Sequence, residues 1–507
     1  MSRKSLIGFG FVMAAAILFV SAGGQEKSSS TPPAGEERYK FSMLVNYDSA
    51  EPAKETSDLM QFFKNTLKAD LDVTFIPTTA YNDKLGVQIA AADLPHVVGV
   101  RSPRSALIIG AVRDGLFWPI DKYLNNPAYP NLQKINSLTL ERLTIDGHIY
   151  GLPWERNLAI SGMFWRQDWM DKLGLKTPAT IDEVYEICKA FTERDPDGNG
   201  RADTTGLSMK GRNLGDFLSN VAIYYGGKHA WYWDDASGSI RNEVDHPAYQ
   251  KALDWFRRLY AEGYFIRNLV ETTDEFVPFV QGRAGMVFVN TITDAVGAQR
   301  DIQKVFPEAT VGFTQKMTTP EGKLAMRSNI GYSGAIMFSR TSIKTEAELD
   351  KIMRFYNEMG TDENILTLRR GIKDKHYTIV DGYLTVSEAQ NKQFNEIDFP
   401  SAGRFYPWGV YKPVPEKLNV PLQQAIEESV TSYDGELYLS LSDVLISETQ
   451  IKLGNSLSDI LQDARMKYVL GQLDLAGWKA AVTEWKKAGG DKVAAEYTED
   501  YKKNFGK

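Results

Sequence analysis

One short loop in this sequence has the residue types and the spacing of a calcium site. Residues 195–203 read Asp-Pro-Asp-Gly-Asn-Gly-Arg-Ala-Asp, which reproduces the alternating oxygen ligands of a calcium-binding loop, with Gly200 at the sharp turn. Calcium needs roughly six to eight oxygen ligands, and alternating residues of a tight loop direct several of them at one point. One of the residues, an arginine, would contribute only its backbone carbonyl. The sequence therefore predicts a structural Ca2+ held by Asp195, Asp197, Asn199, Arg201 and Asp203.

The same loop departs from a complete EF-hand. Its twelfth position, where a bidentate glutamate is usual, is Gly206, and residues 205–207 are typical of a turn into a strand rather than of a helix. A further ligand would have to come from Asp203, Thr204, water or a distant segment. The alternative interpretation is a solvated turn after a helix that ends near Glu193, because Asp, Asn and Gly are common in turns.

A second group of residues has the chemistry of a carbohydrate site. Sugar rings stack on flat aromatic faces, and planar polar side chains bind their neighbouring hydroxyls. The residues predicted to bind ligand are Tyr47, Asp48, Arg101, Trp154, Glu155, Arg156, Trp231, Trp233, Asn329, Tyr332 and Trp408. The two arginines leave acidic sugars open, since a guanidinium can bind a carboxylate through two hydrogen bonds.

Position along the chain selects these residues. Trp154, Glu155 and Arg156 follow a Gly-Leu-Pro turn where the chain should cross between two lobes, and residues 329–332 lie where it should return. The alternating aromatics of residues 231–233 fit either a half-buried strand or a sugar platform. The remaining candidates lie in loops after predicted strands or in the Tyr-Pro-Trp-Gly loop around Trp408. Five other tryptophans fit helical patterns and are expected in the core: Trp165, Trp169, Trp255, Trp478 and Trp485.

Catalytic motifs are absent from the sequence. There is no Gly-x-Ser-x-Gly elbow, His-Glu-x-x-His helix or P-loop, and the five histidines are scattered singly. A glycoside hydrolase needs two carboxylates beside the scissile bond, and Glu155 with Asp48 or Asp121 could form such a pair, but no motif sets their separation. We therefore expect a binding protein without enzymatic activity.

The elements that must position these residues alternate between strand and helix. Residues 39–45 recur with period two, a helical stretch covers 53–67, a strand covers 73–76, a helix covers 81–91, and a third strand covers 96–100. This order predicts a parallel, doubly wound α/β sheet, which binds ligands outside the carboxyl ends of its strands.

Later helices carry start signals. Thr180 with Glu183, and Thr345 with Glu348, form capping boxes ahead of apolar helical faces. Pro247 opens a helix that runs to Tyr260, with Gly263 beyond it. The lone cysteine, Cys188, lies on the apolar side of the first of these helices. Its position predicts a packing role, and a single cysteine excludes an internal disulfide.

The start of the sequence is typical of an exported protein. Residues 1–22 have a basic start, an apolar stretch and a small-residue cleavage site after Ala22, which is typical of a signal peptide, and residues 23–37 are typical of a flexible tether. The rest of the chain is too long for one core. The net charge of −7 disfavours nucleic acid as a partner.

Several segments in order resemble the extracellular solute-binding proteins of carbohydrate ABC importers, especially the LplA-type branch with its alginate-oligosaccharide binders. The segments that carry the resemblance are residues 92–95, 146–153, 165–174, 195–203, 279–286 and 485–491. The resemblance implies a two-lobed periplasmic-binding-protein-like fold with a hinge and a helix-rich C-terminal part. We expect lobe 1 to comprise residues 38–156 plus 327–380, and lobe 2 to comprise residues 157–326 plus 381–507.

The resemblance also implies a function. The expected ligand is a carbohydrate, more consistent with an oligosaccharide than a monosaccharide, held in a cleft between the lobes of a monomer and delivered to the transmembrane subunits of an ABC permease. The expected location is the periplasm or the outer face of the cytoplasmic membrane. Relatives often carry a lipid on a cysteine at the cleavage site, where this sequence has Ala22. The membrane would then be contacted only through the permease or through a lipid anchor. A secreted lectin or a sensor partner is the alternative function from another class.

Overall fold

The computed structural model describes residues 38–416, 420–432 and 436–506. The predicted signal peptide and tether lie outside these residues. Among the described helices, none combines the length and the apolar character that crossing a membrane would require.

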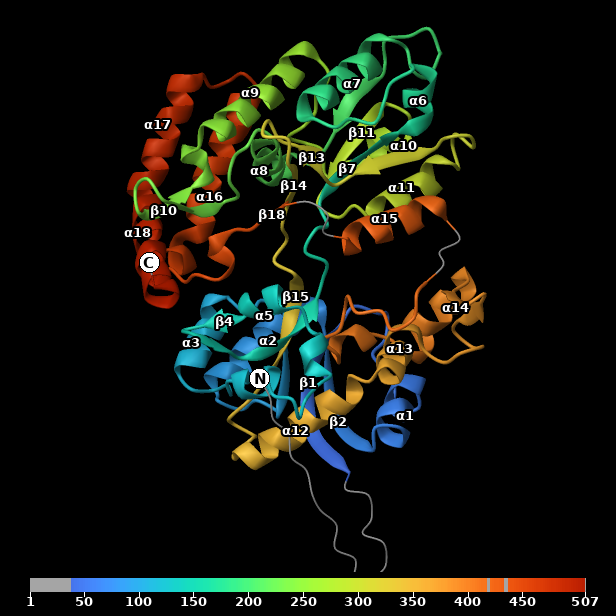
Figure 1. Cartoon of the computed structure of the whole chain (residues 1–507), viewed down its shortest axis with the longest axis vertical. Helices are drawn as coiled ribbons and strands as arrows, with labels where there is room; N and C mark the ends of the chain where they lie inside the picture. Colours follow the sequence, from blue (N-terminus) through green and yellow to red (C-terminus); the bar gives the residue numbers. More distant parts are fainter. Residues whose placement is uncertain (1–37, 417–419, 433–435, 507) are drawn as a thin grey trace, which may run out of the picture. The chain divides into compact units, whose positions relative to one another are not determined.

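The first α/β part is built on a five-stranded sheet (Figure 1). Its strands, in spatial order, are β2 (Ala69–Pro77), β1 (Tyr39–Tyr47), β3 (Val97–Val100), β15 (Tyr332–Phe338) and β6 (Gly151–Glu155). β1 is parallel to β2 and β3, as predicted, whereas β15 runs antiparallel to both β3 and β6. β3 and β6 are both antiparallel to β15, so they run in the same direction as each other. The carboxyl ends of β1, β3 and β6 therefore lie at one edge of the sheet.

Helices cover both faces of this sheet, because successive strand residues point to opposite faces. Met43 and Val45 of β1 join one buried cluster with Phe63 and Tyr356, and Leu44 joins another with Tyr81. The elements around the sheet are α1 (Asp58–Asn65), α2 (Thr78–Ala90), α3 (Ala106–Arg113), α4 (Asp121–Leu124), α5 (Ser137–Glu141), β4 (Thr144–Ile145), β5 (His148–Ile149), α12 (Glu346–Met359), α13 (Asp362–Arg370), β16 (Thr378–Val380), β17 (Tyr383–Thr385) and α14 (Glu388–Lys392).

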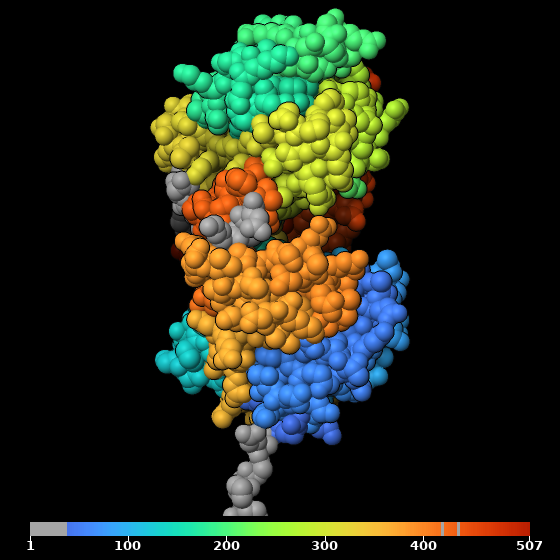
Figure 2. All heavy atoms as spheres, turned by 90° about the vertical axis from the view of Figure 1, so that its right-hand side faces the viewer, coloured from blue at the N-terminus to red at the C-terminus, as the bar shows by residue number. Residues whose placement is uncertain are grey.

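The core of this first part continues further along the chain than the predicted boundary after residue 380. Phe394, Phe399, Phe405 and Trp408 are buried in the same cluster as the first-sheet residues. They sit in short helical turns and loops without strand or helix periodicity, so the sequence carries no pattern that assigns them to a sheet. Figure 2 shows this orange stretch beside the blue segment that contains α1, and Lys375 Nζ lies 2.7 Å from Asp58 Oδ2.

The second α/β part has a four-stranded sheet in the order β12 (Val311–Thr314), β7 (Gly162–Arg166), β11 (Ala284–Val289) and β8 (Thr205–Ser208). β11 is parallel to β8 and antiparallel to β7. Trp165 lies on β7, so its predicted helical position is wrong, although its burial is as predicted. The surrounding helices are α6 (Gln167–Lys172), α7 (Ile181–Glu193), α8 (Leu214–Tyr224), α9 (Pro247–Glu262), α10 (Phe276–Val280), α11 (Asp294–Ile302) and α15 (Pro421–Thr431).

The C-terminal helices pack against this second part. α16 (Glu448–Val469), α17 (Leu475–Trp485) and α18 (Asp491–Phe505), drawn in red in Figure 1, share a core with α8 and α9. Small sheets complete it: β9 (Trp231–Asp234) with β10 (Ser239–Asn242), and β13 (Met317–Thr318) with β14 (Leu324–Arg327) and β18 (Glu436–Tyr438).

The predicted helix signals are confirmed. Thr180 and Thr345 each form a complete capping box, and Cys188 is fully buried. α9 begins at Pro247 and ends at Glu262, and Gly263 caps it with φ 85°.

Candidate functional site

Three charged residues follow the parallel strands at the carboxyl edge of the first sheet. Asp48 comes just after β1, Arg101 follows β3, and Arg156 follows β6. Parallel strands bring the residues after their carboxyl ends to one edge, where ligands of such sheets bind. The structure therefore places three of the predicted site residues along a common edge.

Asp48 is held by an arginine that the sequence pattern did not select. Arg404 Nη2 lies 2.5 Å from Asp48 Oδ2, and the Arg404 guanidinium lies 5.0 Å from the ring centre of Trp154. A hydrogen bond from Thr78 and the positive charges of Arg404 and Arg101 hold the pKa of Asp48 below its ordinary value. Asp48 is consequently an ionised carboxylate surrounded by cations.

Arg156 stands beside two further cations. Its backbone N–H donates to the Gly331 carbonyl at 2.8 Å, and its Nη1 donates to the Glu155 carbonyl at 3.1 Å. Although the side chain reaches solvent, burial and the positive charges of Arg404 and Arg369 lower the pKa of Arg156. A guanidinium whose proton affinity is reduced by like charges is poised to bind an anion.

Glu155 is a buried acid directly before this arginine. Its Oε1 accepts a hydrogen bond from the Asn136 backbone N–H at 2.7 Å. Burial raises the pKa of Glu155 to about 7, although hydrogen bonds from the backbone of Asn136 and Val410 oppose the shift. The Glu155 side chain is fully buried, so it packs beneath the carboxyl edge of the sheet and does not face a ligand.

Two crossing segments, residues 156–161 and 328–331, join the sheets and are hydrogen-bonded to each other. The Asn329 backbone N–H donates to the Leu158 carbonyl at 2.6 Å, in addition to the bond between Arg156 and Gly331. The side chain of Asn329 is exposed. Tyr332, in contrast, is buried, with its hydroxyl 3.4 Å from the Arg142 carbonyl.

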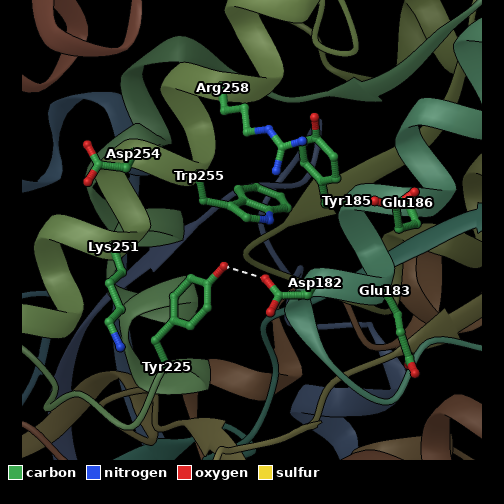
Figure 3. A pocket seen from close by; sticks show the side chains of 9 residues that line it. All are labelled: Asp182, Glu183, Tyr185, Glu186, Tyr225, Lys251, Asp254, Trp255 and Arg258. Carbon is green, nitrogen blue, oxygen red and sulfur yellow. Dashed lines mark hydrogen bonds between the residues drawn. The ribbon is translucent and has the colours of Figure 1, made fainter.

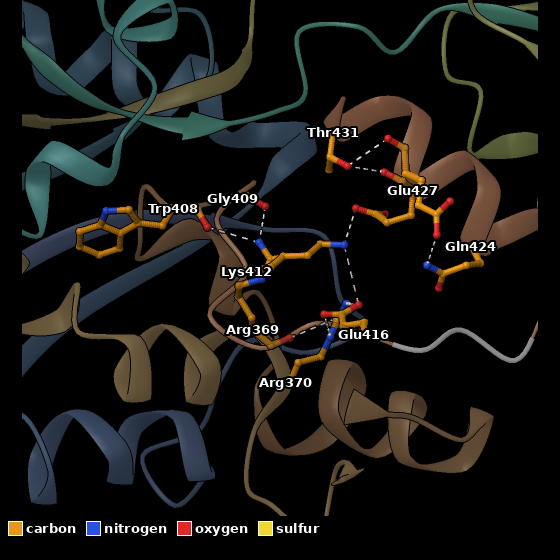
Figure 4. Close-up of polar contacts among 10 residues, drawn as sticks. Arg369, Arg370, Trp408, Gly409, Lys412, Glu416, Gln424, Glu427 and Thr431 are labelled. Carbon is orange, nitrogen blue, oxygen red and sulfur yellow. Dashed lines mark hydrogen bonds and ion pairs between the residues drawn. The ribbon is translucent and has the colours of Figure 1, made fainter. Parts of the chain in front are cut away.

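A third connection follows Trp408 and is drawn in Figure 4. Arg370 Nη2 lies 2.7 Å from Glu416 Oε2, and Lys412 lies between Glu416 and Glu427 of α15, forming an ion pair with the latter. Lys412 thereby links the first part to a helix whose apolar face packs in the second part.

A polar triad at the second sheet was not predicted from the sequence. Asn290, directly after β11, donates through Nδ2 to Asp216 Oδ2 at 3.0 Å and accepts from Arg327 Nη2 at 2.9 Å. Arg327 Nη1 also lies 3.3 Å from Asp216 Oδ1. The available signal was the position of Asn290 after a continuously apolar strand, which is the same rule that selected Asp48 and Arg101.

Three of the predicted sugar-binding tryptophans lie in cores. Trp154 packs so closely against Gly334 that a Cβ there would lie 2.4 Å from its ring, and Trp408 contacts Gly360 in the same way. Trp408 is fully buried and donates through Nε1 to the Asn131 carbonyl at 3.0 Å. Trp231 is packed against Trp485 and Tyr497. Their burial corrects the expectation that they offer open faces to a ligand.

Two other predicted aromatics, Trp233 and Tyr47, are partly accessible. Trp233 stacks on Tyr501 with ring centres 4.8 Å apart, and its alternation with Trp231 is that of a half-buried strand. Tyr47, the last residue of β1, is half-buried and meets Phe75 edge to face.

The loop at residues 195–203 has a backbone suited to converging oxygens. Asp195, Gly198 and Gly200 have φ of 46°, 74° and 74°, which turns the chain tightly around the Asp195 carboxylate. That carboxylate accepts from the backbone N–H groups of Asn199 at 3.1 Å and Gly200 at 3.0 Å. β8 follows the loop, as the sequence indicated, in place of an EF-hand helix.

The donor set of this loop fits a hard cation. Asn199 Nδ2 lies 2.7 Å from Asp197 Oδ2 and 3.1 Å from Asp203 Oδ1, so two acidic side chains meet at this amide, and the Asp195 carboxylate contacts the backbone N–H of the same residue. Burial and the negative charges of Asp195 and Asp203 raise the pKa of Asp197. A cation would relieve this repulsion, with the Arg201 carbonyl as a further oxygen ligand.

A second group of residues of metal-ligand type is held together by a lysine rather than by a metal ion. Ligand atoms of Asp58, His376 and Asp398 lie within 4.8 Å of one another. Lys375 Nζ sits 2.7 Å from Asp58 and 2.9 Å from Asp398, so an ammonium already supplies the positive charge there.

Comparisons with known proteins agree with this architecture. The family described as bacterial extracellular solute-binding protein matches residues 50–349. The polygalacturonan/rhamnogalacturonan-binding protein YtcQ of Bacillus subtilis (strain 168) is 28% identical over 495 residues, covering 97% of both chains.

Two solved structures show the same two-lobed fold. An HMO-binding, ABC-transporter-associated solute-binding protein of Bifidobacterium longum infantis has a TM-score of 0.72 at 17% identity, over 92% of this chain and 99% of that chain. An EF-hand mutant of the ABC-transporter substrate-binding protein FusA of S. pneumoniae, in complex with fructo-nystose, has a TM-score of 0.62 at 15% identity, over 92% and 99%. Since the family match covers more than half of its length, the chain belongs to the bacterial extracellular solute-binding proteins.

Proposed function

We propose that this protein captures an oligosaccharide outside the cytoplasm and delivers it to the transmembrane subunits of an ABC importer. The family supports solute capture, and the relatives compared above include proteins named for binding polygalacturonan and HMO. The observation that carries the proposal is the group of Arg101, Arg156 and Arg404 at the carboxyl edge of the first sheet. Arg404 and Arg101 act on the carboxylate of Asp48, and Arg404 also acts on Arg156.

The excess of positive charge at this edge favours an acidic sugar. Arg404 is paired with Asp48, whereas the charged groups that act on Arg156 are the cations Arg404 and Arg369. A uronic acid would supply the missing carboxylate, which a guanidinium can bind through two parallel hydrogen bonds. The half-buried ring of Tyr47 would contact the apolar face of a sugar ring.

Calorimetric titration with oligogalacturonides and with the same oligomers after reduction of their carboxyl groups tests this proposal. We expect the acidic oligomers to bind and the reduced oligomers to bind at least about tenfold more weakly, because a charged hydrogen bond is lost. Equal affinity for the acidic and the reduced oligomers would contradict the proposal that the ligand is an acidic sugar. A lack of binding to either set, and to a neutral glycan array, would contradict oligosaccharide capture.

The second sheet provides the counterpart for ligand-induced closure. We assign Asp216, Asn290 and Arg327 to the ligand surface of the second part, with Asn329 on the crossing segment between them and the first sheet. Closure requires that the ligand bind the closed state better than the open state. Small-angle scattering should show a smaller radius of gyration with saturating oligosaccharide, and an unchanged profile would contradict hinge closure.

We also propose a structural Ca2+ in the 195–203 loop. The oxygen donors named above support it, and one of the similar solved structures is that of an EF-hand mutant of FusA. The ion would lock the turn between α7 and β8 without taking part in chemistry, and we propose no catalytic activity for the protein.

For location, we propose export by the signal in residues 1–22, followed by action as a monomer. Mass spectrometry of the mature N-terminus would separate cleavage after Ala22 from lipid anchoring.

A further inference from the structure

A groove of about 600 Å³ lies between α7 and α9 in the second part, away from the residues assigned to the interlobe site. Tyr185 and Glu186 on α7, Tyr225 after α8, and Asp254 and Trp255 on α9 are among the residues that line it (Figure 3). None of these residues belongs to the crossing segments or to the sheet edges described above. The groove is therefore a candidate for a separate site.

Trp255 forms the floor of the groove. Its indole stacks on Phe288 with ring centres 6.1 Å apart and meets Phe256 edge to face at 4.8 Å, and the residue is only 5% exposed. Its Nε1–H has no hydrogen-bond partner among the described residues, and Figure 3 shows this nitrogen directed toward the space between Tyr185 and Asp182. A buried donor without an acceptor is costly. The nitrogen is enclosed, so an incoming oxygen reaches this unused hydrogen bond by displacing a neighbouring side chain of the groove.

The walls supply acceptors and an aromatic face. Asp182 accepts a hydrogen bond from the Tyr225 hydroxyl at 2.7 Å, and Asp254 accepts one from Tyr468 at 2.6 Å. The second oxygen of Asp182 is available to a ligand donor, whereas the Asp254 carboxylate is directed away from Trp255 Nε1 (Figure 3). The ring of Tyr225 is half-buried, so part of its face is open to the groove.

The charged groups of the groove restrict the ligand class. Its exposed acids are Asp182, Glu183, Glu186 and Asp254, and its exposed cations are Lys251 and Arg258. The acids outnumber the cations, and Arg258 already lies 4.0 Å above the Tyr185 ring. This balance disfavours a carboxylated ligand. A purely cationic ligand is also disfavoured, because it has no acceptor for the indole N–H.

We propose that this groove is a second carbohydrate site, which binds a neutral pyranoside residue. One sugar hydroxyl accepts from the Trp255 N–H, a second hydroxyl donates to the Asp182 carboxylate, and the C–H face of the ring packs on Tyr225. Its preference for neutral sugars is opposite to that of the arginine edge. Two sites for different residues of one glycan would raise the overall avidity of capture.

The test uses methyl α-D-galactopyranoside as the neutral probe and galacturonic acid as the acidic probe. Each is titrated at millimolar concentration into protein labelled with 15N at the tryptophan indoles, with the Trp255 signal assigned from Trp255→Phe. We expect the Trp255 N–H signal to shift with the neutral probe and to stay unchanged with the acid. Asp182→Asn should weaken this binding about tenfold, because a hydrogen bond to a charged acceptor is lost.

Matched controls separate the groove from the interlobe site. Arg156→Gln should leave the Trp255 titration unchanged, whether or not the interlobe proposal holds. Saturation-transfer NMR on the glycoside gives a second readout for Trp255→Phe, whose aromatic ring should keep the fold and whose melting temperature reports on it. No shift of the Trp255 signal, an equal shift with galacturonic acid, a shift with arginine methyl ester instead of the glycoside, or unchanged binding in Asp182→Asn would overturn the proposal.

Discussion

Arg404 Nη2 lies 2.5 Å from Asp48 Oδ2, and these two residues are separated by 356 positions in the chain. The pair neutralises one guanidinium of the edge and leaves Arg156 beside the positive charges of Arg404 and Arg369. We predict that Arg156→Gln weakens binding of acidic oligosaccharides by about tenfold or more, because a charge-assisted hydrogen bond pair is lost. Calorimetric titration at low and high salt would measure it, with Arg300→Gln on the exposed face of α11 as the matched control. A loss shared equally by both variants would contradict the assignment.

Asp48→Asn should act in the opposite direction on acidic ligands. The substitution removes the carboxylate that pairs with Arg404 and lies near Arg101 at this edge, and it frees the Arg404 guanidinium. We expect the dissociation constant for oligogalacturonides to fall, with the gain disappearing as salt screens the exposed charges. If the affinity instead fell for acidic and neutral ligands alike, Asp48 would be a direct ligand of sugar hydroxyls.

Calcium should stabilise the fold through the 195–203 loop. At a free calcium concentration about a hundred times the dissociation constant, mass action adds about 3 kcal/mol to the free energy of unfolding. Chelation should therefore lower the melting temperature by several degrees, and Asp197→Asn should abolish the calcium response. Asp459→Asn, an exposed carboxylate on α16, is the control that should retain it. An equal calcium response in wild type and Asp197→Asn would contradict the site.

The sequence predicts well where the pattern is local. The period-two strand at residues 39–45, the capping boxes at Thr180 and Thr345, and the strand after the acidic loop depend on residues close together in the chain, and all are present. The rule that ligands bind after the carboxyl ends of parallel strands likewise predicted Asp48 and Arg101, and both lie at the carboxyl edge of the first sheet. These signals are short-range, so a single sequence carries them.

The partners of the site residues depend on long-range packing, which the sequence pattern does not contain. Arg404 lies in a short helical turn, and nothing near it in sequence indicates contact with Asp48. Tryptophan suits both a core and a sugar platform, so residue type alone could not decide that Trp408 is enclosed against Gly360. The triad around Asn290 was missed although the same strand-end rule applies to it.

Trp408 should consequently act on stability rather than on affinity. It is fully buried, and its Nε1 donates to the Asn131 carbonyl. We expect Trp408→Ala to lower the free energy of unfolding by about 3–5 kcal/mol, since a large cavity opens in the core. Trp408→Phe should lose less and should keep the ligand affinity of the wild type, measured below its melting temperature. A large loss of affinity in a folded Trp408→Phe protein would place this residue in the binding surface.

Glu155 should make stability depend on pH at the start of the crossing segment. Burial raises its pKa from 4.5 to about 7, so the folded protein holds this proton more tightly than the unfolded chain does. The contribution is fully present below about pH 4.5 and is lost as pH rises through about 7, a change of about 3 kcal/mol from the difference between the two pKa values. Glu155→Gln keeps the acceptor for the Asn136 N–H and cannot ionise, so its stability relative to wild type should rise between pH 5 and pH 8. Thermal unfolding of both proteins across this range measures the difference, and parallel pH profiles would contradict the raised pKa of Glu155.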